Sequence, residues 1–95
     1  MNEKLGHMQQ ELLFEAMLRL ETADECRRFM TDLCTQAELS AMGQRYHVAV
    51  LLDRERVYHD IAQETSASTA TISRVKRALR YGEDGYKLAL EREKA

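Results

Sequence analysis

The chain has no proline, and only four of its 95 residues are glycine. Strands in a small protein need turns between them, and proline and glycine are the residues that most often make turns. Their scarcity argues against a sheet and predicts an all-α fold. A length of 95 residues is enough for one domain spanning 1–95 and too short for two.

Cysteine is also scarce, because Cys26 and Cys34 are the only two and form neither a CxxC pair nor a zinc-ligand set. We expect both to be small core residues in a reducing compartment, with no metal or cofactor bound. The longest apolar run, 48–52, is far too short to cross a membrane. Residues 1–4 are mostly polar and do not resemble a secretory signal, so a cytoplasmic location is expected.

Positive charge is not in excess either: the net charge is −2, which by itself argues against nucleic-acid binding. The distribution along the chain reverses that conclusion. Residues 66–82 contain four basic side chains and no acidic one, whereas 1–41, 42–65 and 83–95 are each net negative. The positive field is confined to one short segment, which favours a polyanionic partner over a merely solvated helix face.

Apolar residues at helical spacing predict about six helices. Capping boxes at Thr22 and Thr35 open the second and third helices. Thr69 is the expected N-cap of the fifth helix and Asp84 that of the last, while Gly82 is expected to stop the fifth in a left-handed conformation. The expected helices are 5–20, one from 23, one from 36 that ends in the polar run 53–56, then 57–65, 70–81 and one around 86–90.

The first helix is apolar on more than one face, and such a helix has to be covered on two sides. In so short a chain, we expect the cover to come from a second copy. The third helix presents a single apolar stripe instead. The residues of that stripe are Leu39, Met42, Tyr46, Ala49 and Val50.

The fourth and fifth helices, joined by the turn 66–68, predict a helix-turn-helix over 57–81. Its core positions fall at fixed offsets, and Ala62 is small enough to let the two helices cross closely. Ser66 departs from the common pattern, because the left-handed position of the turn usually holds glycine. The expected core residues are Ile61, Ala62, Ala67, Ile72 and Val75.

Because these core positions face inward, the opposite side of the fifth helix is exposed at its start. The short side chains there can enter the major groove of duplex DNA. Basic side chains further along the helix suit phosphates. The expected base contacts are Thr69, Ala70, Thr71 and Ser73, and the expected phosphate contacts are Arg74, Lys76, Arg77 and Arg80.

Catalysis is not expected, because no serine, histidine and carboxylate set is present. Two hypotheses remain. The favoured one is a sequence-specific DNA-binding regulator, since the segment 66–82 is basic and free of acid. The other is a helical protein-interaction module that keeps the fold without binding DNA.

The stretch from Leu33 to Leu90 resembles the Trp repressor family, in particular its YerC/YecD-type branch. The resemblance lies in LCTQAELSAMGQRYHVAVLL and DIAQETSASTATISRVKRAL. It implies a repressor that is an all-helical homodimer with interlocked N-terminal helices. In such a dimer 1–56 dimerises, 57–81 binds a palindromic operator with half-sites about one helical turn apart, and 82–95 forms a C-terminal helix.

In this family two arginines enclose the indole of a bound tryptophan, next to a glycine and a serine. The resemblance places Arg45 and Arg74 at the arginine positions and Thr35 at a nearby threonine. The glycine position holds Val75 and the serine position holds Ala78. The valine side chain fills space that the indole needs and alanine lacks the hydroxyl, so tryptophan is not expected to bind.

Two explanations of this altered effector pocket stay open. Either Val75 takes the place of the ligand and holds the reading helix constitutively, which is the preferred explanation, or the pocket accepts another small molecule. Arg45 has an alternative role of similar weight, a surface salt bridge with Glu38 or Asp53.

Overall fold

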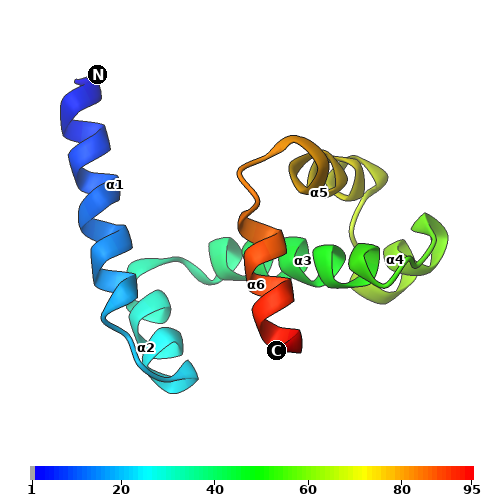
Figure 1. The fold of residues 1–95 in the computed structure, drawn as a ribbon, viewed down its shortest axis with the longest axis horizontal. Helices are drawn as coiled ribbons and strands as arrows, with labels where there is room; N and C mark the ends of the chain where they lie inside the picture. The colour runs from blue at the N-terminus through cyan, green and yellow to red at the C-terminus, as the bar shows by residue number, and fades with distance from the viewer. Residues whose placement is uncertain (1) are drawn as a thin grey trace. The chain divides into compact units, whose positions relative to one another are not determined.

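The structure is a computed structural model that describes residues 2–95. Within that range the chain forms six helices and no strand (Figure 1), which confirms the all-α prediction. No helix of the described range has the length and apolar character needed to cross a membrane. The helices are α1 (Glu3–Leu18), α2 (Ala23–Leu33), α3 (Gln36–Asp53), α4 (Tyr58–Thr65), α5 (Thr69–Tyr81) and α6 (Gly85–Lys94).

The chain divides into two compact units, one up to Gln36 and the other from Ala37 to Ala95. In the first unit, α1 begins two residues earlier than expected because Asn2 caps it, and it ends two residues earlier than expected, at Leu18. Asn2 Oδ1 accepts the amides of Lys4 at 3.0 Å and Leu5 at 3.3 Å. The capping box that opens α2 is confirmed in its first half, since Thr22 Oγ1 accepts the amide of Glu25 at 3.1 Å. The Glu25 carboxylate reaches back one residue further than expected and accepts the amide of Glu21 at 2.8 Å.

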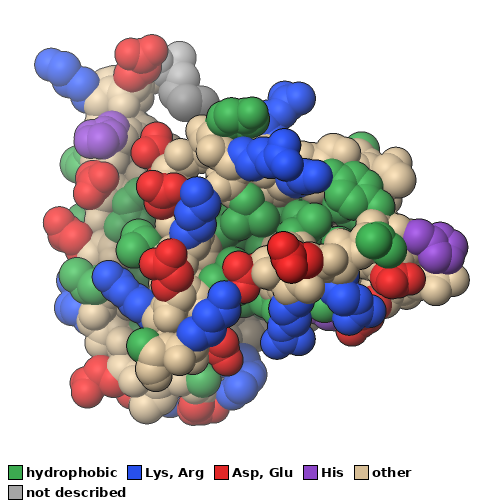
Figure 2. Space-filling model, turned by 45° about the vertical axis from the view of Figure 1, so that its right-hand side comes forward, with side chains coloured by type: hydrophobic (Ala, Val, Ile, Leu, Met, Phe, Trp, Pro, Cys, Tyr) green, Lys and Arg blue, Asp and Glu red, His purple; other side chains and the backbone are tan. Residues whose placement is uncertain are grey.

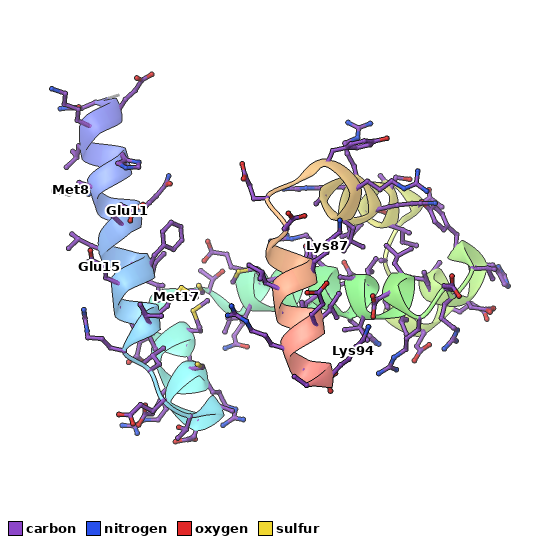
Figure 3. The ribbon with its side chains drawn as sticks, in the orientation of Figure 1. Met8, Glu11, Glu15, Met17, Lys87 and Lys94 are labelled. Atoms are coloured by element: carbon purple, nitrogen blue, oxygen red, sulfur yellow. The ribbon has the colours of Figure 1, made fainter. Side chains whose placement is uncertain are left out.

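Helix α1 buries none of its residues within the chain. Met8 and Met17 are nine positions apart, and at about 100° per residue they project from opposite sides of the helix (Figure 3). Both side chains are about half exposed, so the apolar surface is two-sided as predicted. The core assignment of the cysteines is wrong within the chain, because Cys26 is exposed and Cys34 is only half-buried.

The second unit contains the core, which α3, α4, α5 and the turn before α5 build together. On α3 the expected stripe is partly wrong: Val48 and Leu51, which it omits, are buried, while Tyr46, which it includes, is 39% exposed. The buried apolar cluster consists of Val48, Ala49, Leu51, Ile61, Ala67, Ile72 and Val75.

Helix α6 crosses α3 (Figure 1), and side chains join the two helices at two places. The rings of Tyr46 and Tyr86 are stacked with centroids 6.3 Å apart. Lys94 Nζ lies 2.6 Å from Asp53 Oδ2, and this hydrogen bond raises the pKa of Lys94 above its ordinary value. Helix α6 therefore contacts α3 through a pair of rings and an ion pair.

The link between α5 and α6 corrects two sequence expectations. Gly82 is extended, with φ −86° and ψ −150°, and is not left-handed. Glycine is nevertheless required there, because a Cβ would lie 2.4 Å from the carbonyl oxygen of Ala78. Asp84 occupies the N-cap position of α6 in the left-handed region, but its side chain makes no capping hydrogen bond and lies 3.6 Å from Lys87 Nζ instead.

Candidate nucleic-acid interface

The turn between α4 and α5 places Ser66 in the left-handed region, with φ 62° and ψ 14°. Its amide closes the end of α4 by donating to the carbonyl oxygen of Ala62 at 2.9 Å. The left-handed conformation predicted for this position is therefore present although the residue is serine. An L side chain in that region stores strain that the surrounding contacts must offset.

Thr65 and Gln44 supply those contacts, and sequence reasoning identified neither. Thr65 Oγ1 donates to the carbonyl oxygen of Ile61 at 2.7 Å and accepts the amide of Ala67 at 3.1 Å. Gln44 Nε2, from α3, donates to the carbonyl oxygen of Thr65 at 3.1 Å. The turn is thus bound both to the helix before it and to the core helix α3.

The N-cap of α5 is Ser68 and not Thr69, which corrects the expected boundary. Ser68 Oγ accepts the amide of Thr71 at 3.1 Å and donates to Thr71 Oγ1, also at 3.1 Å. Thr69 becomes the first helical residue and is exposed. The hydroxyl of Thr71 is held from within the protein, and its side chain is half-buried.

Helix α5 has one buried side and one exposed side. Ile72 and Val75 are 0% and 1% exposed and face the core, as predicted, together with Ile61 and Ala67; Ala62 is half-buried. The opposite side presents residues at spacings of three, four and seven, the pattern of one helical face. We call this set the outward face, and it comprises Ala70, Ser73, Arg74 and Arg77, all exposed.

Of the other two predicted phosphate contacts, Arg80 lies at the edge of the outward face, three residues after Arg77, and Lys76 lies on the adjoining flank of α5. Arg80 is exposed, whereas Lys76 is half-buried with its Nζ 5.4 Å from the centroid of the Tyr58 ring. Within residues 2–95 no carboxylate forms an ion pair with any of the four cations of α5. Figure 2 shows Lys and Arg side chains in both the upper and the lower part of the view, interspersed with acidic side chains.

Of the residues of the predicted effector pocket, Val75 and Ala78 have different surroundings within the second unit. Val75 belongs to the core, and Ala78 lines a cavity of about 400 Å³ whose lining includes Tyr46 and Tyr86 but neither Arg45 nor Arg74. Thr35 belongs to the first unit.

The alternative role of Arg45 is also partly corrected. Asp53 pairs with Lys94, so the salt bridge between Arg45 and Asp53 is not formed.

Comparisons with known proteins agree with the helical fold. The family model described as the Trp repressor protein matches residues 8–94. The uncharacterized protein YerC of Bacillus subtilis (strain 168) is 49% identical over 92 residues, covering 97% of this chain and 88% of that protein.

Two solved structures are similar over nearly the whole chain. One is a protein of Staphylococcus aureus named as a candidate Trp repressor, with a TM-score of 0.89, 46% identity and coverage of 97% of this chain and 92% of that chain. The other is a TrpR-like protein of Eubacterium eligens ATCC 27750, with a TM-score of 0.87, 49% identity and coverage of 96% and 94%. The chain belongs to the Trp repressor family, a family of regulatory DNA-binding proteins rather than enzymes.

Proposed function

We propose that the protein is a sequence-specific DNA-binding transcriptional regulator that represses transcription as a homodimer. The observation that carries the proposal is the outward face of α5, where short side chains and two arginines are exposed on a helix without acidic residues. Ser73 and the other side chains expected to contact bases lie at the start of α5 and contact base edges. The basic side chains of α5 contact phosphates. Ile72 and Val75 anchor the opposite side, so the reading face is presented on a fixed helix.

The homodimer is supported by the apolar surface of α1. Met8, Phe14 and Met17 are each about half exposed although they are large and apolar, and a second copy would remove them from water. In this proposal the whole chain acts as one domain. Residues 1–56 dimerise, 57–81 bind a palindromic operator, and 82–95 form a C-terminal helix that packs against α3.

We further propose that DNA binding does not require tryptophan. Val75 is 1% exposed and packs within the core cluster, which fills the position where the family accommodates the indole. Ala78 offers no hydroxyl to a ligand. The reading helix is thus held by the protein's own side chain.

Fluorescence anisotropy with labelled duplex DNA of random sequence tests the proposal. A dimer that neutralises on the order of six phosphates binds tightly at low salt and loses affinity with a log–log slope of roughly −5. An Arg74→Gln, Arg77→Gln variant should bind weakly. Arg92→Gln, which removes an exposed cation of α6, serves as the control and should bind like the wild type. Absence of binding at low salt would contradict the proposal and favour the protein-interaction module.

A further inference from the structure

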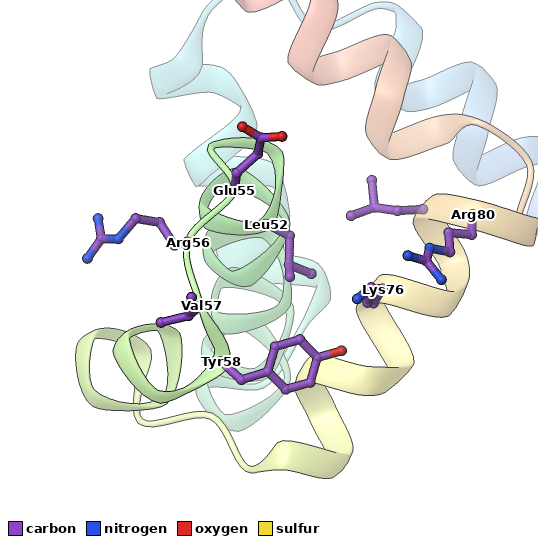
Figure 4. Close-up of a pocket in the computed structure, with 8 residues that line it drawn as sticks. Leu52, Glu55, Arg56, Val57, Tyr58, Lys76 and Arg80 are labelled. Carbon is purple, nitrogen blue, oxygen red and sulfur yellow. The ribbon is translucent and has the colours of Figure 1, made fainter.

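A cavity of about 590 Å³ lies between the end of α3, the start of α4 and one flank of α5 (Figure 4). Its volume falls within the range of about 300–1,000 Å³ that is usual for small-molecule sites. We call it the flank pocket. Its apolar lining comes from Leu52, Val57 and Leu79, and its polar lining includes Tyr58, Lys76 and Arg80.

Two cations meet in the flank pocket. Lys76 and Arg80 are four residues apart on α5, a spacing at which like charges repel each other across one helical turn. Figure 4 shows both side chains and the Tyr58 ring directed toward one another. Within the described residues, neither cation has a carboxylate in ion-pair contact. An anion placed between them would remove the repulsion.

The other charged residues of the pocket do not offset these cations. Arg56 lines the pocket, but its guanidinium pairs with Glu64 at 3.1 Å and points away from Lys76 in Figure 4. Glu55 lies at the edge, with its carboxylate turned away from Lys76 and Arg80. The flank pocket therefore combines the positive charges of Lys76 and Arg80 with an apolar lining.

We propose that the flank pocket binds a small organic anion that releases the protein from DNA. Its phosphate or carboxylate group lies between Lys76 and Arg80, and its apolar body lies against Leu52 and Leu79. The release rests on the proposed function, in which the same two cations contact DNA phosphates. Ligand and DNA then compete for one pair of charges, which lowers the DNA affinity whenever the ligand is bound.

The flank pocket is separate from the cavity of about 400 Å³ that Ala78 lines. The two cavities share no lining residue, since the one that Ala78 lines contains neither Lys76 nor Arg80. The two pockets lie on different sides of α5, because a helix turns by about 100° per residue.

The test is a titration of the full chain, without DNA, with phenyl phosphate, followed by calorimetry and by amide chemical shifts. Inorganic phosphate has the charge without the ring, and phenol has the ring without the charge. Phenyl phosphate should bind at least about tenfold more tightly than either, with shifts centred on residues 76–80. Lys76→Gln and Arg80→Gln should each weaken it about tenfold, the effect of one charge-assisted hydrogen bond.

Arg92→Gln is the matched control, because it removes an exposed cation of the same unit that lies outside the pocket. Equal loss of phenyl phosphate binding in Lys76→Gln and Arg92→Gln would overturn the proposal. So would equal affinity for phenyl phosphate and inorganic phosphate. Circular dichroism establishes that each variant is folded, and Arg80→Gln provides the same comparison if Lys76→Gln is not.

A second titration uses the protein bound to duplex DNA. Phenyl phosphate should release the DNA at concentrations where phenol and inorganic phosphate do not. If the protein binds duplex DNA but not phenyl phosphate, the flank-pocket proposal is overturned and the proposed function stands. If it binds phenyl phosphate through Lys76 but binds no duplex DNA, the proposed function fails, and with it the release from DNA.

Discussion

The hydroxyl oxygens of Ser68 and Thr71 lie 3.1 Å apart, and Ser68 Oγ also accepts the amide of Thr71 at the same distance. Ser68 therefore caps α5 and at the same time orients the Thr71 side chain at the end of the helix that is proposed to enter the groove. The cap satisfies an amide that has no partner within the helix. One serine thus connects the stability of α5 with the geometry of its reading end.

Replacing this cap should destabilise the protein. Ser68→Ala is expected to lower the free energy of unfolding by about 1 kcal/mol, because the amide of Thr71 loses its partner. Ser68→Asp, which can still accept that hydrogen bond, should retain most of the stability. Urea denaturation followed by circular dichroism measures both. Ser73→Ala is the control on the same helix, and a loss as large as that of Ser68→Ala would contradict the capping role.

Much of the helix-turn-helix could be predicted because its signals are local. Ile61, Ala67, Ile72 and Val75 occupy offsets that follow from helical periodicity, and all four are buried. The exposed face of α5 follows from the same periodicity, since it lies opposite the core residues.

The N-cap of α5 could not be assigned with the same certainty. Ser68 and Thr69 are adjacent and both have suitable side chains. The choice depends on where the chain enters the helix, which the burial of Ala67 and the left-handed turn at Ser66 fix. The cap at Asn2 cannot be identified in the same way, because the apolar pattern of α1 begins at Leu5 and carries no information on the cap.

Contacts between distant residues gave no signal in a single sequence. Gln44 reaches the carbonyl oxygen of Thr65 across 21 residues, and Lys94 reaches Asp53 across 41. Each pair forms only once the helices are packed. The flank pocket escaped prediction in the same way, because it joins residues of α3, α4 and α5.

Glycine substitutions at two serines, one in the left-handed turn and one in α5, should change the free energy of unfolding in opposite directions. Ser66→Gly should raise the free energy of unfolding by about 1 kcal/mol, because glycine adopts φ 62° without strain. Ser73→Gly, in the middle of α5, should lower it by about 0.5 kcal/mol through loss of helix propensity. Thermal and urea unfolding compare the two. A destabilised Ser66→Gly variant would show that the serine side chain contributes more than the strain.

In the proposed function, independence from tryptophan depends on Val75. Val75→Gly should lower the free energy of unfolding by about 3 kcal/mol, combining a cavity with a glycine inside a helix. It should also loosen α5, weaken DNA binding and allow tryptophan to restore part of it. Anisotropy titrations with and without tryptophan measure this response, with Val75→Ala as a milder comparison. If tryptophan does not change the DNA affinity of Val75→Gly, Val75 is not what excludes the ligand.

Arg77 and Ser73 are neighbours on the outward face, and their variants should behave differently. Arg77→Gln should weaken binding to all duplexes alike and reduce the salt slope of a dimer by about 2, one phosphate contact per subunit. Ser73→Ala should leave the salt slope unchanged and alter the preference at one base pair of each half-site by about 1–3 kcal/mol. Competition titrations with operator variants separate these effects. A sequence-selective loss in Arg77→Gln would contradict its assignment to a phosphate.

Selection of binding sites from a random duplex pool decides whether the chain is a dimeric, ligand-independent reader of DNA. The purified protein is used at two salt concentrations and without added ligand. We predict recovery of a two-fold palindrome with half-sites about one helical turn apart, enriched at the lower salt concentration. Recovery of no sequence at the lower salt concentration would contradict the proposed function.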